Sequence, residues 1–201
     1  MVFVDAVRSG DPGVSGLAGV ADVIATEGQV YAASPVDNTV VSFARGADGV
    51  LTPLDLEQDN VLGVTGLAGA RALALSPDGV HLYAAGSLVN ALAVFRRDVE
   101  SSSANHGKLD FVASVQNAVG GVSGLTQPVA VAVSPDGKHV YAVGGSSIAA
   151  FARNTNSGSA NFGRLTFVAS YANGGSIVGL NDVRSIVFNA DGAHLYVLGA
   201  T

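Results

Sequence analysis

Two arginines and one aspartate stand where charged side chains could act on a small ligand. Arg71, Arg184 and Asp22, with Val129 in the remaining copy, align at the start of a segment that recurs four times. The guanidinium fork suits a carboxylate or phosphate, and a carboxylate such as Asp22 can act as the general base that activates water. We therefore predict a substrate-binding site at these three charged residues. The alternative is that the arginines pair with Asp22 or Asp182 and only balance charge.

Three of the four histidines share a second recurring position. His81, His139 and His194 each precede a tyrosine by two residues, and Gln29 holds that place in the first copy. A position kept in every copy serves the fold first, so a structural role beside a turn is favoured over metal binding or catalysis. His106 lies in a variable loop, and the sequence shows no partner for it.

Other patterns that bear on catalysis or cofactors are weak. The alternating acids of 55–59 could bind Ca²⁺ loosely, but they lack a multi-oxygen loop and are interpreted as a solvated edge strand. The glycines of 10–16 precede no helix and no Gly-Lys-Ser/Thr, so they do not indicate a nucleotide loop. The chain has no cysteine and no Gly-x-Ser-x-Gly elbow. We expect neither a metal nor a cofactor, and we assign no catalytic residue.

Composition narrows the partners and leaves the compartment open. The 201 residues carry a net charge of −6 with scattered basic residues, which argues against nucleic acid, because phosphate backbones need clustered Lys and Arg. No stretch is long and apolar enough to span a membrane, and the first residues lack the basic and apolar regions of a signal peptide. A content of 48% hydrophobic and 13% charged residues favours a buried core over disorder.

A repeated unit positions these residues. The pattern around Tyr31 recurs at Tyr83, Tyr141 and Tyr196, at separations of 52, 58 and 55 residues. Self-similarity at this period indicates one supersecondary unit stacked on copies of itself. Each copy holds four short segments of alternating pattern, and a Ser-Pro-Asp-Gly turn or a variant of it joins the first two. We name these predicted strands A to D.

The predicted fold is an all-β propeller of four-stranded antiparallel blades, with a period of about 52–58 residues. A β-sandwich is the alternative, but a sandwich does not require the same turn in every copy. The innermost strand A would line a central channel, so Arg71 and Arg184 could face one mouth. The arginines that end strand C would cover the outer strands with their aliphatic stems; they are Arg45, Arg97 and Arg153.

The chain is predicted to be one repeat array over residues 1–201. Its parts are strand D of a closing blade at 1–7, blades at about 20–56, 70–115 and 128–171, and an incomplete blade at 183–201. The last blade lacks strand C, so we expect a partial or half ring; about seven blades at this period need roughly 385 residues. The open strand B would be covered if the chain is a truncation or if a homodimer closes the ring.

Two segments carry a family resemblance. Ser76–Ala85 and Ser134–Val143, followed by a strand that ends in Phe plus a basic residue and by strands such as Leu165–Val168, resemble the repeat of bacterial lactonase-type seven-bladed propellers. That family includes 6-phosphogluconolactonase and carboxymuconate cyclase. The segments are also similar to the YVTN repeat of surface-layer propellers. The resemblance covers nearly the whole chain, and implies that Arg71 and Arg184 hold an anionic substrate and that the protein is extracellular or periplasmic.

Two functions from different classes remain open. The first is a non-catalytic module, part of a larger exported bacterial protein, whose loops bind a protein or a glycan. The second is a fragment of a lactonase-type hydrolase that acts on a small anionic sugar lactone in the channel. The absence of a visible catalytic constellation favours the first, and the two arginines favour the second.

Overall fold

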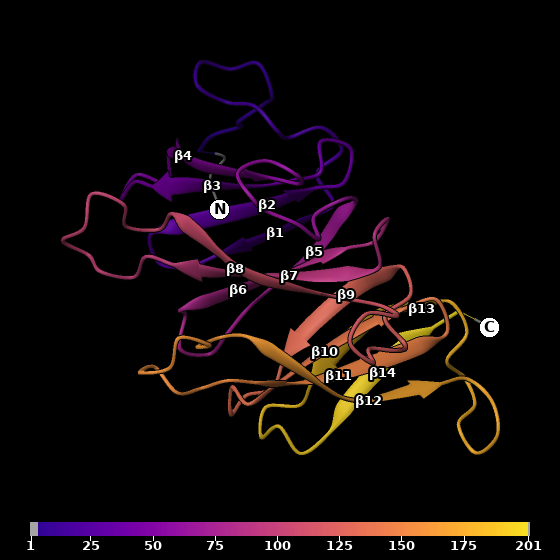
Figure 1. Ribbon diagram of the computed structural model, residues 1–201. Helices are drawn as coiled ribbons and strands as arrows, with labels where there is room; N and C mark the ends of the chain where they lie inside the picture. Colours follow the sequence, from indigo (N-terminus) through magenta and orange to yellow (C-terminus); the bar gives the residue numbers. More distant parts are fainter. Residues whose placement is uncertain (1–3, 201) are drawn as a thin grey trace.

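The computed structural model describes residues 4–200, which hold fourteen β-strands and no helix (Figure 1). Blade 1 comprises β1 (Asp22–Ala25), β2 (Gln29–Ser34), β3 (Thr39–Arg45) and β4 (Leu51–Gln58). Blade 2 comprises β5 (Ala70–Leu75), β6 (His81–Gly86), β7 (Ala91–Arg97) and β8 (Leu109–Gln116). Blade 3 comprises β9 (Pro128–Val133), β10 (His139–Gly144), β11 (Ser147–Arg153) and β12 (Leu165–Ala172). Blade 4 has only β13 (Val183–Phe188) and β14 (Leu195–Gly199).

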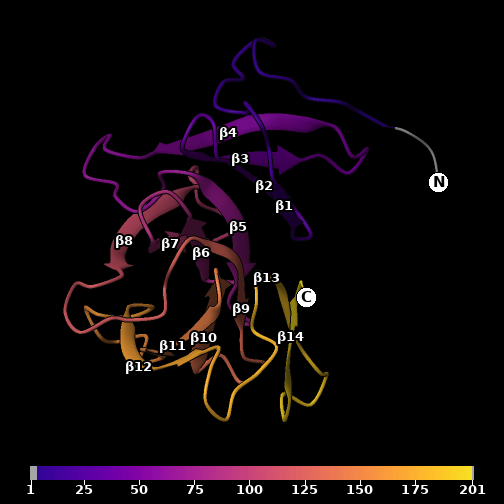
Figure 2. The same cartoon turned by 90° about the vertical axis from the view of Figure 1, so that its right-hand side faces the viewer.

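Each complete blade is an antiparallel meander in which the strands pair in chain order. The first strands, β1, β5, β9 and β13, contact one another from blade to blade, and in Figure 2 they lie on the inside while β4, β8 and β12 lie outside. The predicted all-β propeller is therefore confirmed. Within the described residues no helix is long and apolar enough to cross a membrane.

The turn between the first two strands is built by its own side chains. In blade 2 the hydroxyl of Ser76 accepts a hydrogen bond from the His81 N–H at 2.9 Å, and Asp78 Oδ1 accepts one from the Val80 N–H at 3.0 Å. Gly79 takes the left-handed conformation at φ +71 that closes the turn. Blade 3 repeats these bonds with Ser134 and Asp136.

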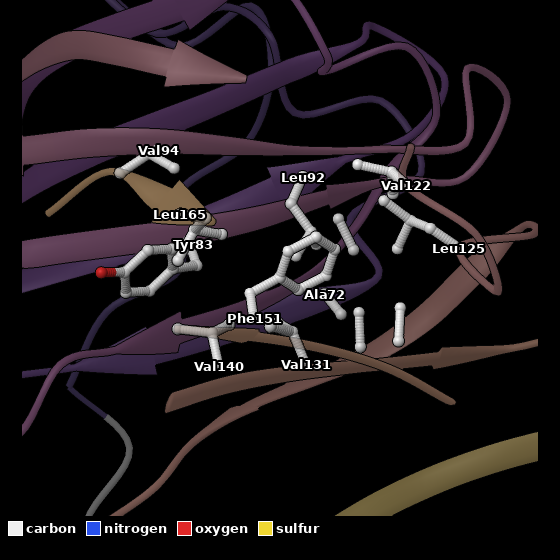
Figure 3. Packing of buried hydrophobic residues seen from close by; sticks show 13 residues of the cluster. Ala72, Tyr83, Leu92, Val94, Val122, Leu125, Val131, Val140, Phe151 and Leu165 are labelled. Atoms are coloured by element: carbon white, nitrogen blue, oxygen red, sulfur yellow. The ribbon is translucent and has the colours of Figure 1, made fainter. Parts of the chain in front are cut away.

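The core lies between blades, where the face of one sheet packs on the next. Between blades 2 and 3, Tyr83 and Leu92 from one sheet meet Val131, Val140 and Phe151 from the other (Figure 3). Alanines at many facing positions let the two sheets approach, and the larger side chains fill the remaining space. Because each blade has little core of its own, its stability depends on its neighbours.

The N-terminal segment differs from the prediction. Met1–Phe3 lie outside the described residues, and Val4–Val7 form no strand. Strand D of a blade must pair with strand C, and no unpaired strand C exists among residues 4–200. The segment nevertheless packs as a strand D would. Asp5 Oδ2 accepts the Leu51 N–H at 3.1 Å, just as Asp55 Oδ2 of blade 1 accepts the Leu109 N–H of blade 2 at 3.0 Å.

Candidate functional site

Arg71 and Arg184 occupy equivalent places on two innermost strands. Each is the second residue of its strand, β5 and β13, at the end where the chain enters the blade. The pairing register skips both residues. Ala70 and Ala72 pair with Gly86 and Ala85, which leaves Arg71 in a bulge, and β13 skips Arg184 in the same way. Both side chains are exposed, and a bulge turns such a residue away from the sheet.

Between these two strands lies β9, in which Val129 is bulged in the same manner. Arg71 of blade 2 and Arg184 of blade 4 therefore hold equivalent places on the strands at either side of β9, which carries the apolar Val129 at the same place. A carboxylate or phosphate beside these strands would meet the guanidinium of Arg71 on one side and the ion pair of Arg184 with Asp182 on the other. The prediction that Arg71, Val129 and Arg184 are structural equivalents agrees with the strand registers.

Asp22 does not occupy the position that the sequence alignment assigned to it. It pairs with Ala33, as Ala72 pairs with Ala85, so its equivalent in blade 2 is Ala72 and the equivalent of Arg71 is Ala21. Its carboxylate is already engaged, because Oδ2 accepts the Leu73 N–H at 2.7 Å. Asp22 thus ties β1 to the free edge of β5.

The charge-balancing alternative holds for one arginine. Arg184 pairs with Asp182, and both side chains remain more than half exposed. Asp182 has φ 43, in the left-handed region, which places its carboxylate beside the bulge two residues later. Arg71, by contrast, forms no ion pair within the part of the chain that the structure describes. The positive charge of Arg184 is therefore partly neutralised by Asp182, whereas Arg71 has no such partner among the described residues.

The arginines that end the third strands have a role that the sequence analysis missed. Arg97 and Arg153 are buried, with 5% and 6% exposure, and they reach the preceding blade instead of covering outer strands. Arg97 Nε donates to the Tyr31 hydroxyl at 2.8 Å, and its guanidinium stacks over that ring at 5.2 Å from the centroid. The Tyr31 hydroxyl in turn donates to the Gly107 carbonyl at 2.9 Å. We call this contact the blade joint.

A second blade joint, between blades 2 and 3, includes a histidine. Arg153 Nη2 donates to Asp78 Oδ2 at 2.6 Å and to His81 Nδ1 at 3.0 Å, while the Tyr83 hydroxyl donates to the Gly163 carbonyl at 3.2 Å. Burial, and next the positive charge of Arg153, lower the pKa of His81 to about 4. The imidazole is therefore neutral at physiological pH and serves as an acceptor. The structural role predicted for this position holds at His81.

The sequence repeat singles out the arginines and tyrosines of the blade joints, but it does not show which arginine contacts which tyrosine. An arginine at the end of strand C and a tyrosine in strand B recur in each copy that includes those strands. Sequence spacing alone does not show that the arginine of one blade meets the tyrosine of the blade before it. That contact joins residues 66 positions apart at Arg97 and Tyr31.

The acidic strand β4 also contributes to blade packing. Asp55 holds the backbone of Leu109, as described above, and Glu57 lies beside it. Burial, and then the charges of Asp55 and Asp110, raise the pKa of Glu57 to about 7. Across residues 4–200 no group of three or more His, Asp or Glu side chains is placed to hold a metal ion. The strand interpreted as a solvated edge is thus partly an interface.

Successive four-stranded meanders, innermost strands gathered around one axis and blade joints between them define this class of protein as a β-propeller. The chain belongs to the lactonase family of seven-bladed β-propellers, which matches residues 29–200. This confirms the resemblance stated from the repeat motifs. No curated protein is significantly similar to the chain in sequence.

Solved structures show the same fold. A candidate 6-phosphogluconolactonase from Bacteroides uniformis aligns with a TM-score of 0.67 and 19% identity, over 92% of this chain and 51% of its own. A functionally unknown protein from Desulfotomaculum acetoxidans aligns at 0.65 and 20%, over 89% and 51%. The periplasmic gluconolactonase of Pseudomonas aeruginosa aligns at 0.60 and 22%, over 85% and 47%. The chain spans about half the length of these proteins.

Proposed function

We propose that this chain forms part of a lactonase-type propeller that binds a small anionic ligand, of the acidic sugar lactone class, at the channel mouth. The supporting observation is the matched placement of Arg71 and Arg184, bulged and exposed on two innermost strands. A guanidinium fork at each place can hold a carboxylate or phosphate group of a ligand that lies across Val129. Membership of the lactonase family supports the same ligand class.

The residues at this mouth favour binding more clearly than they favour hydrolysis. Opening a lactone requires a base that delivers water to the ring carbonyl. Asp22 is held by the Leu73 amide, and the carboxylate of Asp182 faces Arg184. We therefore assign Arg71 and Arg184 to ligand binding, and we assign hydrolysis to neither of them.

The binding test uses 6-phosphogluconate, the open-chain acid of this ligand class, with calorimetry on the wild-type chain. R71A and R184A are each expected to weaken binding by roughly tenfold to a hundredfold, because each removes a charge-assisted contact. R164A, which removes an exposed arginine outside the channel mouth, is the matched control and should bind normally. Equal affinity in wild type, R71A and R184A would contradict the assignment.

A second candidate function, binding of a protein or a glycan by loops, rests on a different observation. Apolar residues are exposed at the tips of the loops that surround the same end of the blades. Leu62 is 100% exposed and has φ 50, and Val178, Leu88 and Val36 are 82%, 73% and 68% exposed. An exposed leucine in a left-handed backbone is unusual and suggests a contact role. In that case L62S would abolish binding of a macromolecule, and R71A would leave it unchanged.

A further inference from the structure

An aspartate of the outer strand β4 bridges two backbone N–H groups where blades 1 and 2 meet. Asp55 Oδ1 accepts the N–H of Leu56, its neighbour in the chain, at 3.0 Å, and Oδ2 accepts the N–H of Leu109 in blade 2 at 3.0 Å. Asp22 makes the same kind of bridge between the innermost strands of these two blades. A carboxylate with one oxygen on each N–H is thus a recurring contact between neighbouring blades.

Blade 2 has no carboxylate at the corresponding place. The strand register makes Ala113 the equivalent of Asp55. It also makes Leu165 of blade 3 the equivalent of Leu109 in blade 2. The N–H groups of Ser114 and Leu165 therefore correspond to the two that the aspartate bridges, but the methyl group of alanine offers them no acceptor.

The two contacts also differ in charge. Between blades 1 and 2, Glu57 and Asp110 line a cavity of about 290 Å³ together with Asp55. Between blades 2 and 3, Val115 and Thr166 hold the places of Glu57 and Asp110. An anion would be repelled by the three carboxylates of the first contact, whereas the second contact carries no such charge.

A cavity of about 410 Å³ lies at this second contact, between β8, the loop that follows it and β12; we call it the interblade cavity. Its lining includes Ser114 and Leu165, which carry the two unbridged N–H groups. Val115, Val122 and Phe167 give it apolar walls, and none of the described residues that line it is charged. Its volume falls within the range of about 300–1,000 Å³ that is usual for small-molecule sites.

We propose that the interblade cavity binds a small carboxylic acid of the form R–CH2–COO⁻, in which R is an apolar group. The ligand carboxylate accepts the N–H groups of Ser114 and Leu165, as the Asp55 carboxylate does in the preceding contact. An aspartate side chain is itself a carboxylate on a CH2 group, so an acetate derivative reproduces the part that Ala113 lacks. The group R packs on the valines and on Phe167. This site lies on outer strands and is separate from the arginines of the ligand site proposed above.

Phenylacetate is the probe, and NMR titration of the isotope-labelled wild-type chain is the measurement. The amide signals of Ser114 and Leu165 should move in a saturable way, because a charged acceptor then joins both N–H groups. Phenylacetamide has the same shape without the charge and should bind at least about tenfold more weakly. Gluconate keeps the carboxylate, but its hydroxyl groups would lose water against apolar walls, and it should also bind at least about tenfold more weakly. Unmoved amide signals, or equal affinity for phenylacetate and either control ligand, would overturn the proposal.

A113D supplies the missing aspartate and should close the site from within. Its carboxylate should bridge Ser114 and Leu165 as Asp55 does, and phenylacetate binding should weaken by about a hundredfold or more. A47D adds the same side chain at an exposed position of blade 1 and should bind as the wild type does. Circular dichroism establishes that both variants are folded. Undiminished binding by folded A113D contradicts the assignment of the site.

V115S tests the apolar wall and leaves both N–H groups in place. The substitution exposes the ligand to a hydroxyl group and removes part of the apolar contact, so phenylacetate should bind roughly threefold to tenfold more weakly. This variant decides the matter if A113D does not fold. Wild-type affinity in V115S would mean that the ligand does not lie against β8, and the proposal would fail.

Discussion

At the scale of single residues, three arginines at one repeat position show how the neighbour sets the role. Arg97 and Arg153 are buried because the tyrosine face of a preceding blade lies against them, while Arg45 at the first blade is exposed. A buried guanidinium is tolerated only when its donors are satisfied and its charge is balanced. Turn carbonyls and, in the second joint, Asp78 meet most of that requirement, although Arg153 Nε has no hydrogen-bond partner among the described residues.

Removal of Arg153 should therefore destabilise the fold. R153A leaves His81 without its hydrogen-bond donor and Asp78 without its counter-ion, and is expected to lower the free energy of unfolding by roughly 2–4 kcal/mol. Urea denaturation of R153A against wild type measures the loss. R164A, an exposed arginine on the neighbouring loop, should change stability by less than about 0.5 kcal/mol. If R153A changed the free energy of unfolding as little as R164A does, the blade joint would not contribute to stability as predicted.

The buried histidine should make stability depend on pH. The folded-state pKa of His81, about 4, lies below its ordinary value of 6.5, so between these values the unfolded chain binds more protons than the folded chain. Its contribution is present above pH 6.5 and is lost as the pH falls toward 4. The charged groups that face it are Arg153, Asp78 and Arg96, and Arg153 and Arg96 oppose protonation.

H81Q isolates this effect, because glutamine holds the same place in blade 1. There Gln29 Oε1 accepts a hydrogen bond from Arg97 Nη2 at 2.9 Å, so a glutamine at position 81 can keep the acceptor without titrating. We expect the stability of wild type relative to H81Q to fall by roughly 2–3 kcal/mol from pH 7 to pH 4. Denaturation curves at several pH values measure it. Parallel pH profiles for the two proteins would contradict a neutral His81.

At the scale of elements, the loop between the third and fourth strands must come close to the preceding blade. Gly163 has φ +82, and a Cβ there would lie 2.1 Å from the His81 ring. Glycine is required both by the left-handed backbone and by the lack of space. The same position holds Gly107 in blade 2, where a Cβ would lie 2.5 Å from Gln29. The repeated glycine is thus a packing requirement of the blade joint.

G163A should consequently be costly. The added methyl group must displace the His81 ring and also strains the backbone, so we expect a loss of roughly 2–4 kcal/mol in unfolding free energy. G158A in the same loop is the matched control, since its Cβ would meet only the Asn156 side chain at 3.5 Å and its φ is ordinary. Thermal unfolding of both variants measures the difference. If G163A and G158A melted at the same temperature, the loop that contains Gly163 would accommodate the added methyl group without loss of stability.

At the scale of the whole molecule, the blades follow an open arc with blades 1 and 4 at its ends (Figure 2). The blade joint is directional, because the arginine of one blade meets the second strand of the blade before it. Arg71 and Arg184 come from blades 2 and 4, so the distance between them depends on the angle between successive blades. We therefore expect a change at a blade joint to alter the separation of Arg71 and Arg184 without contacting either residue.

Much of the fold could be predicted from the sequence, because its signals are local. The alternation of apolar residues and the Ser-Pro-Asp-Gly turn depend only on neighbours in the chain. From them we expected the three complete blades at about 20–56, 70–115 and 128–171, and the structure has them at 22–58, 70–116 and 128–172. The candidate site was only partly predictable. Asp22 was aligned one residue out of register, because the bulge that shifts β5 at Arg71 leaves no mark in the composition.

The sequence by itself determined the all-β class, the repeat, the strand order and the equivalence of Arg71 with Arg184, since periodicity and turn chemistry are encoded within each copy. Only the tertiary structure decided that Arg153 meets His81 and Tyr83, that Asp22 holds the Leu73 amide, and that Val4–Val7 packs as an outer strand without forming one. These contacts join different blades, and their free energy depends on the burial, charge and geometry that arise when one sheet packs on another.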